Sequence, residues 1–452
     1  MRLPITLSLL LAAAASLHGE APSVQGTMPE DSLPGLKPLL SEAVERSPST
    51  IAASLTIASY EAGRYGAVSS LLPRLYGGAN YSVNTEAVSQ SQSSTSRGLY
   101  YSAGVSQNLF EWGALKNQLA ISNLAIKISS RQYEDAYRQL AVVIREQYMA
   151  LVSRKITLRN EHFKEKIANE SMNAEKAKYE AGSVSQAELQ GYSMLLEDAT
   201  LSADRAQEDY DYSKRVLTRL VGIDDLSDDS IPLELPHPVY SAPLADVILT
   251  GFVGDGIEST FQSEIYRMQL KQSDLNYSIA KVRLLPTLGA GANFAYSNNA
   301  EPQGNKVIQV ATTSENYSIA ATWNIFDGFA TRGAKLSALV TKRLYERQRK
   351  TYVEQTIDTV TDMRHKLGFA SRGLSLAEVR NALVEAEVKR LGEDKDLGYA
   401  SQATIDTGTL NFYATQSLMA TARAEYFGLW TEYVSVVGID PALANISPRY
   451  VR

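Results

Sequence analysis

The residue types that most often carry out chemistry are few in this chain of 452 residues, and they are not grouped. Cysteine is absent, which removes disulfides, thiolate metal sites and thiol nucleophiles together. The four histidines, His18, His162, His237 and His365, are scattered, and none has a metal-binding partner four residues away. The stretch Gly251–Gly256 resembles a phosphate-binding loop only superficially, because no Lys-Ser/Thr pair follows it. We therefore predict neither an enzyme nor a bound cofactor or metal.

The charge balance and the first residues indicate where the protein acts. A net charge of -6 argues against nucleic-acid binding, which needs a basic face. Arg2, the apolar run 3–17 and the triplet Gly19-Glu20-Ala21 are typical of a secretory signal peptide over residues 1–21. An anchoring helix is the alternative, but the apolar run is shorter than the roughly 20 residues that a membrane span needs. We expect export, with a leader over 22–38.

The rest of the chain is an internal duplication. Leu71-Leu72-Pro73-Arg74-Leu75 returns as Leu284-Leu285-Pro286-Thr287-Leu288, and many later residues repeat at an offset of 216. We predict a first repeat over 39–224, a Pro-rich acidic linker over 225–247, a second repeat over 248–440 and a tail over 441–452.

After each Pro, the hydrophobic pattern changes to an alternation with a period of two residues, as in a β-strand. It predicts hairpins over 74–110 and 287–326, each with one lipophilic face and one small, polar face. Such faces are typical of a membrane barrel with a wet lumen. The residues that we expect to face lipid are Leu99, Tyr101, Val105, Tyr317, Ile319 and Trp323. Four strands cannot close a barrel alone, so the chain must oligomerise; the strand count allows a dimer with eight strands or a trimer with twelve.

Each hairpin precedes a pair of helices. Residues 111–180 contain no Pro and predict a helix about 100 Å long, which a turn and a return helix over 184–222 follow. The return helix carries a coiled-coil seam with alternating three- and four-residue spacing, in which Ala203 and Ala206 allow close helix approach. The second repeat predicts the same pair over 327–397 and 400–437.

Together, the duplicated Leu-Leu-Pro strands, the Asn-x-Phe strand ends at Asn108 and Asn324, and the paired long helices resemble the TolC family of outer-membrane efflux channels. This resemblance implies an α+β membrane protein in which three chains form a twelve-stranded barrel in the outer membrane, continued by an α-helical tunnel in the periplasm. It also implies a passive exit duct whose tips dock a periplasmic adaptor that recruits an inner-membrane transporter. The alternative is a periplasmic coiled-coil adaptor or scaffold, which would not need two hairpins with a lipophilic face.

The resemblance also implies a gate at the helical tips, which we expect at Gly182, Ser183 and Val184 and around Gly398. Glu188 stands where the family has an acidic residue that holds the entrance closed. The second tip departs from the family pattern, with the residues Lys395, Thr404 and Thr407. Asp406 is either a displaced acidic ring or a solvated helix carboxylate. We hypothesise that a contact between Glu188 and Lys395 helps to hold the closed state.

Overall fold

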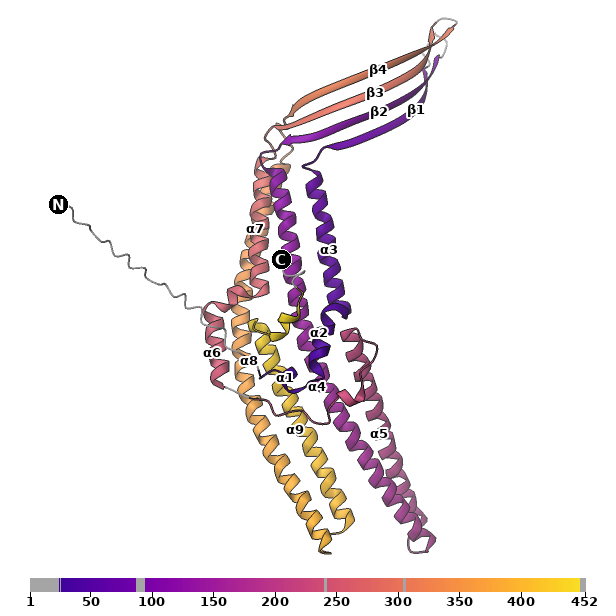
Figure 1. Cartoon of the computed structure of the whole chain (residues 1–452), viewed down its shortest axis with the longest axis vertical. Helices are drawn as coiled ribbons and strands as arrows, with labels where there is room; N and C mark the ends of the chain where they lie inside the picture. Colours follow the sequence, from indigo (N-terminus) through magenta and orange to yellow (C-terminus); the bar gives the residue numbers. More distant parts are fainter. Residues whose placement is uncertain (1–23, 25, 87–93, 240–241, 304–305, 448–452) are drawn as a thin grey trace, which may run out of the picture.

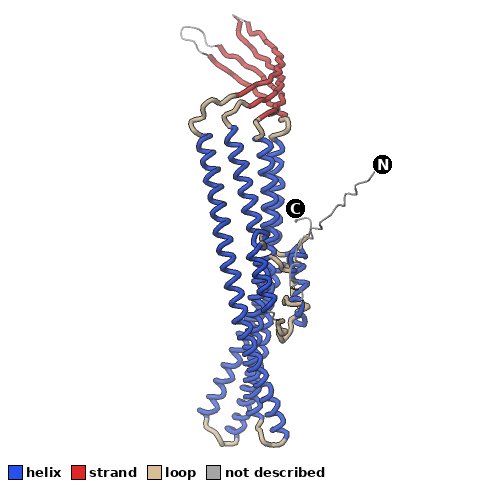
Figure 2. The backbone as a smooth tube through the Cα atoms, turned by 90° about the vertical axis from the view of Figure 1, so that its left-hand side faces the viewer, coloured by secondary structure: helices blue, strands red, loops and turns tan. Residues whose placement is uncertain are grey.

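The computed structural model describes residues 24, 26–86, 94–239, 242–303 and 306–447. The predicted signal peptide, residues 1–21, lies outside the described residues. The molecule is elongated, with a β-sheet at one end and two helical hairpins at the other (Figure 1). Between the two ends, long helices run side by side (Figure 2).

The sheet contains four antiparallel strands in the order β1-β2-β3-β4. β1 is Arg74–Glu86, β2 is Ser94–Phe110, β3 is Thr287–Gln303 and β4 is Lys306–Thr322. β1 and β3 each begin directly after the Pro of a Leu-Leu-Pro motif, where a helix cannot continue. Because β1 and β4 each pair on one side only, both edges of the sheet are open in the single chain.

The register shows which side chains share a face of the sheet. Leu75 lies opposite Val105, Tyr101 lies opposite Tyr296, and the two tyrosine rings stack at 4.7 Å. Directly opposed residues of antiparallel strands point to the same side. Five of the residues expected to face lipid therefore share one face: Leu99, Tyr101, Val105, Tyr317 and Ile319.

Two further details of the sheet bear on the predictions. β4 ends at Thr322, before the predicted end at 326, so Trp323 follows the strand and lies at the junction with the helices. On the polar face, the Tyr76 ring lies over Gly104 so closely that a Cβ there would meet the ring at 2.5 Å. A glycine at position 104 is therefore needed for this packing.

The two repeats have helices of equal length. α4 (Ala114–Glu180) and α8 (Ala330–Asp396) have 67 residues each, and the return helices α5 (Gln186–Val221) and α9 (Gln402–Val437) have 36 each. The shorter helices α3 (Pro48–Ser69) and α7 (Phe261–Val282) flank the long ones beside the sheet. In the half of the bundle next to the sheet, neighbouring helices follow the order α3, α4, α7, α8. In the half that ends at the helical tips, the order is α5, α4, α9, α8.

The segments at the ends of the repeats pack around the middle of the bundle. α1 (Pro29–Ser32) and α2 (Leu36–Arg46) precede the first repeat's long elements, and a 3₁₀ helix, Pro441–Asn445, follows α9. In the predicted linker, Ile231 and Leu235 are buried, and α6 (Ala242–Gly254) begins before the predicted linker end at 247. The described parts of the linker, 225–239 and 242–247, therefore pack on the bundle rather than forming a free connection.

The core lies at this middle level and is divided into two clusters. One cluster contains Tyr137 and Tyr148 of α4 and Leu217 of α5. The other contains Trp430 and Tyr433 of α9, packed against residues of α6 and α8. In the α5 seam, Ala203 and Ala206 are buried, as the heptad pattern predicts.

Candidate functional site

The first tip is the tight turn between α4 and α5. Gly182 has a φ of 73°, in the left-handed region that favours glycine, and its N–H donates to the Tyr179 carbonyl at 2.9 Å. The Ser183 N–H donates to the Lys178 carbonyl at 2.8 Å, and Val184 completes the turn. The last carbonyls of α4 are thus satisfied by the turn itself, which fixes the angle between the two helices.

The Glu188 side chain caps the start of its own helix, α5. The Glu188 N–H donates to Ser185 Oγ at 3.2 Å, and the Ser185 N–H donates back to Glu188 Oε2 at 3.0 Å. This is a capping box, in which each residue satisfies a free N–H group of the other. The backbone and side-chain hydrogen bonds from Ser185 lower the pKa of Glu188. The carboxylate therefore stays charged and ordered at the tip.

The second tip has the same turn but a different cap. Gly398 has a φ of 79°, and its N–H donates to the Lys395 carbonyl at 2.8 Å. Ser401 caps α9 by accepting from the Thr404 N–H at 3.2 Å, but Thr404 has no carboxylate that could accept from the Ser401 N–H in return. Thr407 only bonds the Ala403 carbonyl of its own helix, at 2.9 Å.

The charged side chains of the second tip also bond within that tip. Lys395 Nζ donates to Gln402 Oε1, and Gln402 Nε2 donates to Asp406 Oδ1 at 2.7 Å. Gln402 thus links Lys395 and Asp406 into one chain of hydrogen bonds. Among the described residues of the single chain, no ion pair joins Glu188 and Lys395, because each is bonded beside its own turn. The hypothesised contact between them is therefore not formed within one chain.

The structure brings the two hairpins together farther from the tips, at residues that the sequence patterns did not single out. The Arg159 guanidinium of α4 donates to Gln416 Oε1 of α9 and lies over the Tyr413 ring, 4.6 Å from its centroid. The neighbouring Asn160 Nδ2 donates to the Tyr413 carbonyl at 3.1 Å, and Phe163 packs edge-on against the same ring. We call Arg159, Asn160, Tyr413 and Gln416 the cross-hairpin contact. It joins the first repeat directly to the second.

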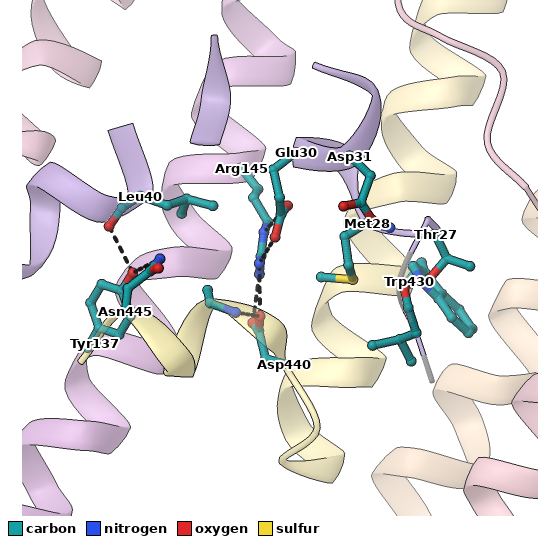
Figure 3. A network of polar contacts seen from close by, with 12 residues as sticks. Thr27, Met28, Glu30, Asp31, Leu40, Tyr137, Arg145, Trp430, Asp440 and Asn445 are labelled. Carbon is teal, nitrogen blue, oxygen red and sulfur yellow. Dashed lines mark hydrogen bonds and ion pairs between the residues drawn. The ribbon is translucent and has the colours of Figure 1, made fainter. Parts of the chain in front are cut away.

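A buried ionic network joins the two ends of the described chain at the middle of the bundle (Figure 3). Arg145 of α4 has no exposed surface and donates to both carboxylate oxygens of Glu30 and of Asp440, at 2.5 to 2.9 Å. Burial lowers the pKa of Arg145, but the hydrogen bonds and charges of Asp440 and Glu30 outweigh this effect and raise it overall. Arg145 is therefore a permanent cation between two carboxylates.

The same region holds two neutral contacts that anchor the chain ends. Tyr137 donates to the Leu40 carbonyl at 2.8 Å and accepts from Asn445 Nδ2 at 3.2 Å, and burial raises the pKa of its hydroxyl to about 12. Trp430 Nε1 donates to Thr27 Oγ1 at 3.1 Å. The network thus fastens residues 27–40 and 440–445 to the long helices.

No group of three or more His, Asp and Glu side chains able to hold a metal ion occurs within the described residues. No helix in the described part of the chain is both long and apolar enough to cross a membrane. A shallow cavity of about 580 Å³ lies on the sheet, with Ala103, Ala292 and Phe294 in its lining. Glu315 and Tyr317 also line it, and the Tyr317 hydroxyl donates to the Glu315 carboxylate at 3.4 Å.

Part of the first repeat matches a known protein family. Residues 39–223 match the model of the outer membrane efflux protein family. A comparison with curated protein sequences gives no significant match.

Several solved structures share the fold along nearly all of their length. The Campylobacter jejuni CmeC outer membrane channel is 14% identical with a TM-score of 0.67, and the match covers 100% of this chain and 97% of that one. The open state of the Neisseria gonorrhoeae MtrE outer membrane channel is 15% identical with a TM-score of 0.64, covering 90% of each chain. The Vibrio cholerae outer membrane protein VceC is 15% identical with a TM-score of 0.61, covering 89% and 96%.

Proposed function

We propose, from the match of residues 39–223 to the model of the outer membrane efflux protein family, that this chain is the outer-membrane channel of a tripartite efflux or secretion system. It is a passive exit duct and not an enzyme. Its sheet lies in the outer membrane and its helices extend into the periplasm. The solved structures that share its fold are outer-membrane channels and an outer-membrane protein, which supports the same assignment.

The observation that carries the proposal is the pair of open edges. On one side, β1 pairs with β2 alone and α3 packs against α4 and α2. On the other side, β4 pairs with β3 alone and α8 packs against α7, α9 and, at the middle level, α6. Leu75 of β1 is 84% exposed and Ile319 of β4 is 81% exposed. Edge strands left open promote pairing with another chain, and a head-to-tail contact that repeats around an axis closes into a ring.

Three copies would place β1 of each chain against β4 of the next and give a barrel of twelve strands. The same step would place α8 of one chain beside α3 and α5 of its neighbour and continue the barrel as a helical tunnel. The lipophilic face with Leu99, Tyr101 and Val105 then meets lipid. A soluble adaptor or scaffold would leave this face exposed to water, so the sheet favours the channel.

The tips lie at the end of the molecule farthest from the sheet (Figure 1). In a chain inserted by its sheet, they extend deepest into the periplasm. We assign the docking of a periplasmic adaptor, and through it of an inner-membrane transporter, to the surface around Gly182, Glu188, Gly398 and Asp406. We assign the closing of the entrance to the cross-hairpin contact in addition to this tip surface.

The test of the assembly uses the absence of native cysteine. Single Cys pairs placed on the outer flanks of α3 and α8 should form disulfides between copies, and non-reducing electrophoresis should show bands up to three chains. The same material should fractionate with the outer membrane and form channels in planar bilayers. A soluble periplasmic monomer would contradict the proposal.

The test of closure compares single-channel conductance of Arg159→Ala with that of wild type. We expect a larger conductance, because the substitution removes both the Gln416 hydrogen bond and the stacking on Tyr413. Arg380→Ala, an exposed arginine of α8, is the matched control. Equal conductance in all three proteins would remove the cross-hairpin contact from the gate.

A further inference from the structure

The junction between the sheet and the helices carries two kinds of exposed side chain that the channel assignment does not explain. Five aromatic rings are exposed where the strands end and the helices begin: Phe110, Trp112, Trp323, Phe326 and Phe329. Around them, within two turns of the same junction, lie six cations: Arg74, Lys116, Lys281, Arg283, Arg332 and Lys335. We call these eleven residues the junction collar.

The rings are held in place rather than free to turn. Trp112 Nε1 donates to the Pro286 carbonyl at 2.7 Å, and Trp323 Nε1 donates to the Leu284 carbonyl at 3.0 Å, so both indoles are fixed to the second Leu-Leu-Pro motif. Phe110 packs edge-on against Trp112 at 5.1 Å, and Phe326 does so against Phe329 at 5.5 Å. The collar is therefore an ordered apolar surface open to its surroundings.

The backbone is strained to present two of these rings. Trp112 has a φ of 53° and Phe329 a φ of 68°, a region that bulky residues rarely adopt. Each lies next to a glycine that is also left-handed, Gly113 in the first repeat and Gly328 in the second, so the aromatic residue and the glycine exchange places between the repeats. Strain that is retained in both copies points to a role for the exposed ring.

The charge of the junction is opposite to that of the chain. The segments 67–76, 108–117, 280–289 and 321–335 contain six cations and two carboxylates, a net charge of +4, whereas the whole chain carries -6. One of the two carboxylates, Asp327, accepts from the Thr331 N–H at 2.8 Å and is thereby engaged within the turn. Arg74, Lys116, Lys281, Arg283 and Arg332 are exposed, so their charge is presented outward.

We propose that the junction collar is a binding surface for anionic phospholipid, and that it sets the depth at which the sheet stops in the membrane. Tryptophan rings such as those of Trp112 and Trp323 favour the boundary between acyl chains and head groups, and lysine and arginine beside them bind lipid phosphates. The three phenylalanines add apolar area to the same surface. The collar lies at the helix side of the apolar sheet face, where a bilayer around the sheet would end. The proposal rests on the proposed membrane insertion and adds the class of lipid that the protein selects.

The chain itself supplies the probe. Only three tryptophans occur, of which Trp112 and Trp323 belong to the collar, while Trp430 is buried in the middle of the helix bundle. The full-length protein is reconstituted in phosphatidylcholine vesicles with bromine at a shallow or a deep acyl position. We expect stronger quenching by the shallow bromine. The phenylalanine variants Trp112→Phe and Trp323→Phe assign the quenched signal.

Lipid selection is measured by comparing brominated phosphatidylglycerol with brominated phosphatidylcholine in mixed vesicles. Wild type should be quenched preferentially by the anionic lipid. The double variant Lys281→Gln/Arg283→Gln should lose this preference several-fold, because each basic side chain near an anionic surface contributes roughly a factor of five. The control Arg380→Gln/Lys389→Gln removes the same charge from the exposed surface of α8 near the tips and should retain the preference.

The outcomes separate the two proposals. Quenching of wild type by both lipids to the same extent, or equal loss of preference in the control variant, would overturn the anionic-lipid site while leaving membrane insertion in place. Stronger quenching by the deep bromine would overturn the assignment of depth. No quenching by any brominated lipid would overturn the membrane insertion itself.

Discussion

Replacing Arg145 by Met should destabilise the protein more than any surface substitution. The side chain of Arg145 has no exposed surface, that of Asp440 has none either, and that of Glu30 is 10% exposed. Methionine fills a similar volume but leaves two carboxylates buried without a cation. Removing one partner of a buried ion pair costs about 3 to 5 kcal/mol, and here the remaining partners also repel each other.

The measurement is urea unfolding of the purified protein in detergent, in a Trp112→Phe/Trp323→Phe background. The fluorescence then reports Trp430, whose indole is bonded to the same N-terminal segment. Limited proteolysis should show earlier cleavage of residues 24–47 in Arg145→Met than in wild type. The triple variant Arg145→Met/Glu30→Gln/Asp440→Asn should recover most of the loss, because a neutral set replaces the unpaired charges. A single variant as stable as wild type would refute the argument, and so would a triple variant no better than the single one.

Three further predictions concern the sheet, the seam and the first tip. Val105→Arg on the lipophilic face should cost about 2 to 4 kcal/mol, measured as the yield of heat-resistant oligomer, whereas Ser102→Arg on the polar face should be tolerated; equal damage would mean that the faces are misassigned. Ala203→Leu should cost about 1 to 3 kcal/mol by overpacking and lower the thermal stability of the oligomer, since Ala203 is 1% exposed; an unchanged transition would remove it from the helix contact. The pKa of Glu188 is lowered in the folded protein, so the stability that its charge adds to the start of α5 is present above pH 4.5 and is lost as the pH falls through the folded pKa. Hydrogen-exchange protection of the Ser185 amide, which donates to the Glu188 carboxylate, should therefore fall in acid. That of the Ser401 amide in the equivalent cap, where residue 404 has no carboxylate, should fall less; the same loss at both tips would contradict the assignment.

Much of the fold is readable from local patterns. Pro73 and Pro286 end helices, and the alternation after them requires strands, so the strand starts follow from steric rules alone. The seam of α5 follows from its heptad spacing, which is why the burial of Ala203 could be predicted. Periodicity alone extends β4 too far, because the apolar residues Trp323 and Ile325 continue the alternation past the last paired residue, Thr322. Periodicity reports which side an apolar residue faces but not whether its backbone is paired.

Most of the polar contacts cannot be predicted from the sequence. Arg159 and Gln416 are 257 residues apart and Arg145 and Asp440 are 295 residues apart, and no local pattern reports such pairs. The capping role of Glu188 is different, because Ser-x-x-Glu at 185–188 is a recognised helix-start signature and could have been read directly. The family resemblance predicts a role for Glu188 in the gate. In the structure, its carboxylate bonds Ser185 at the start of its own helix.

The equal lengths of the paired helices constrain how such a protein can change size. Inserting seven residues into α4 would extend it by about 10 Å, and the seam with α5 would then require a compensating insertion there. The second repeat would need the same insertions, because otherwise the two tips of the chain would no longer lie at the same level. In the proposed trimer, the length of the tunnel would thus be shared by four helices, and it would change only through matching insertions of whole heptads in all four.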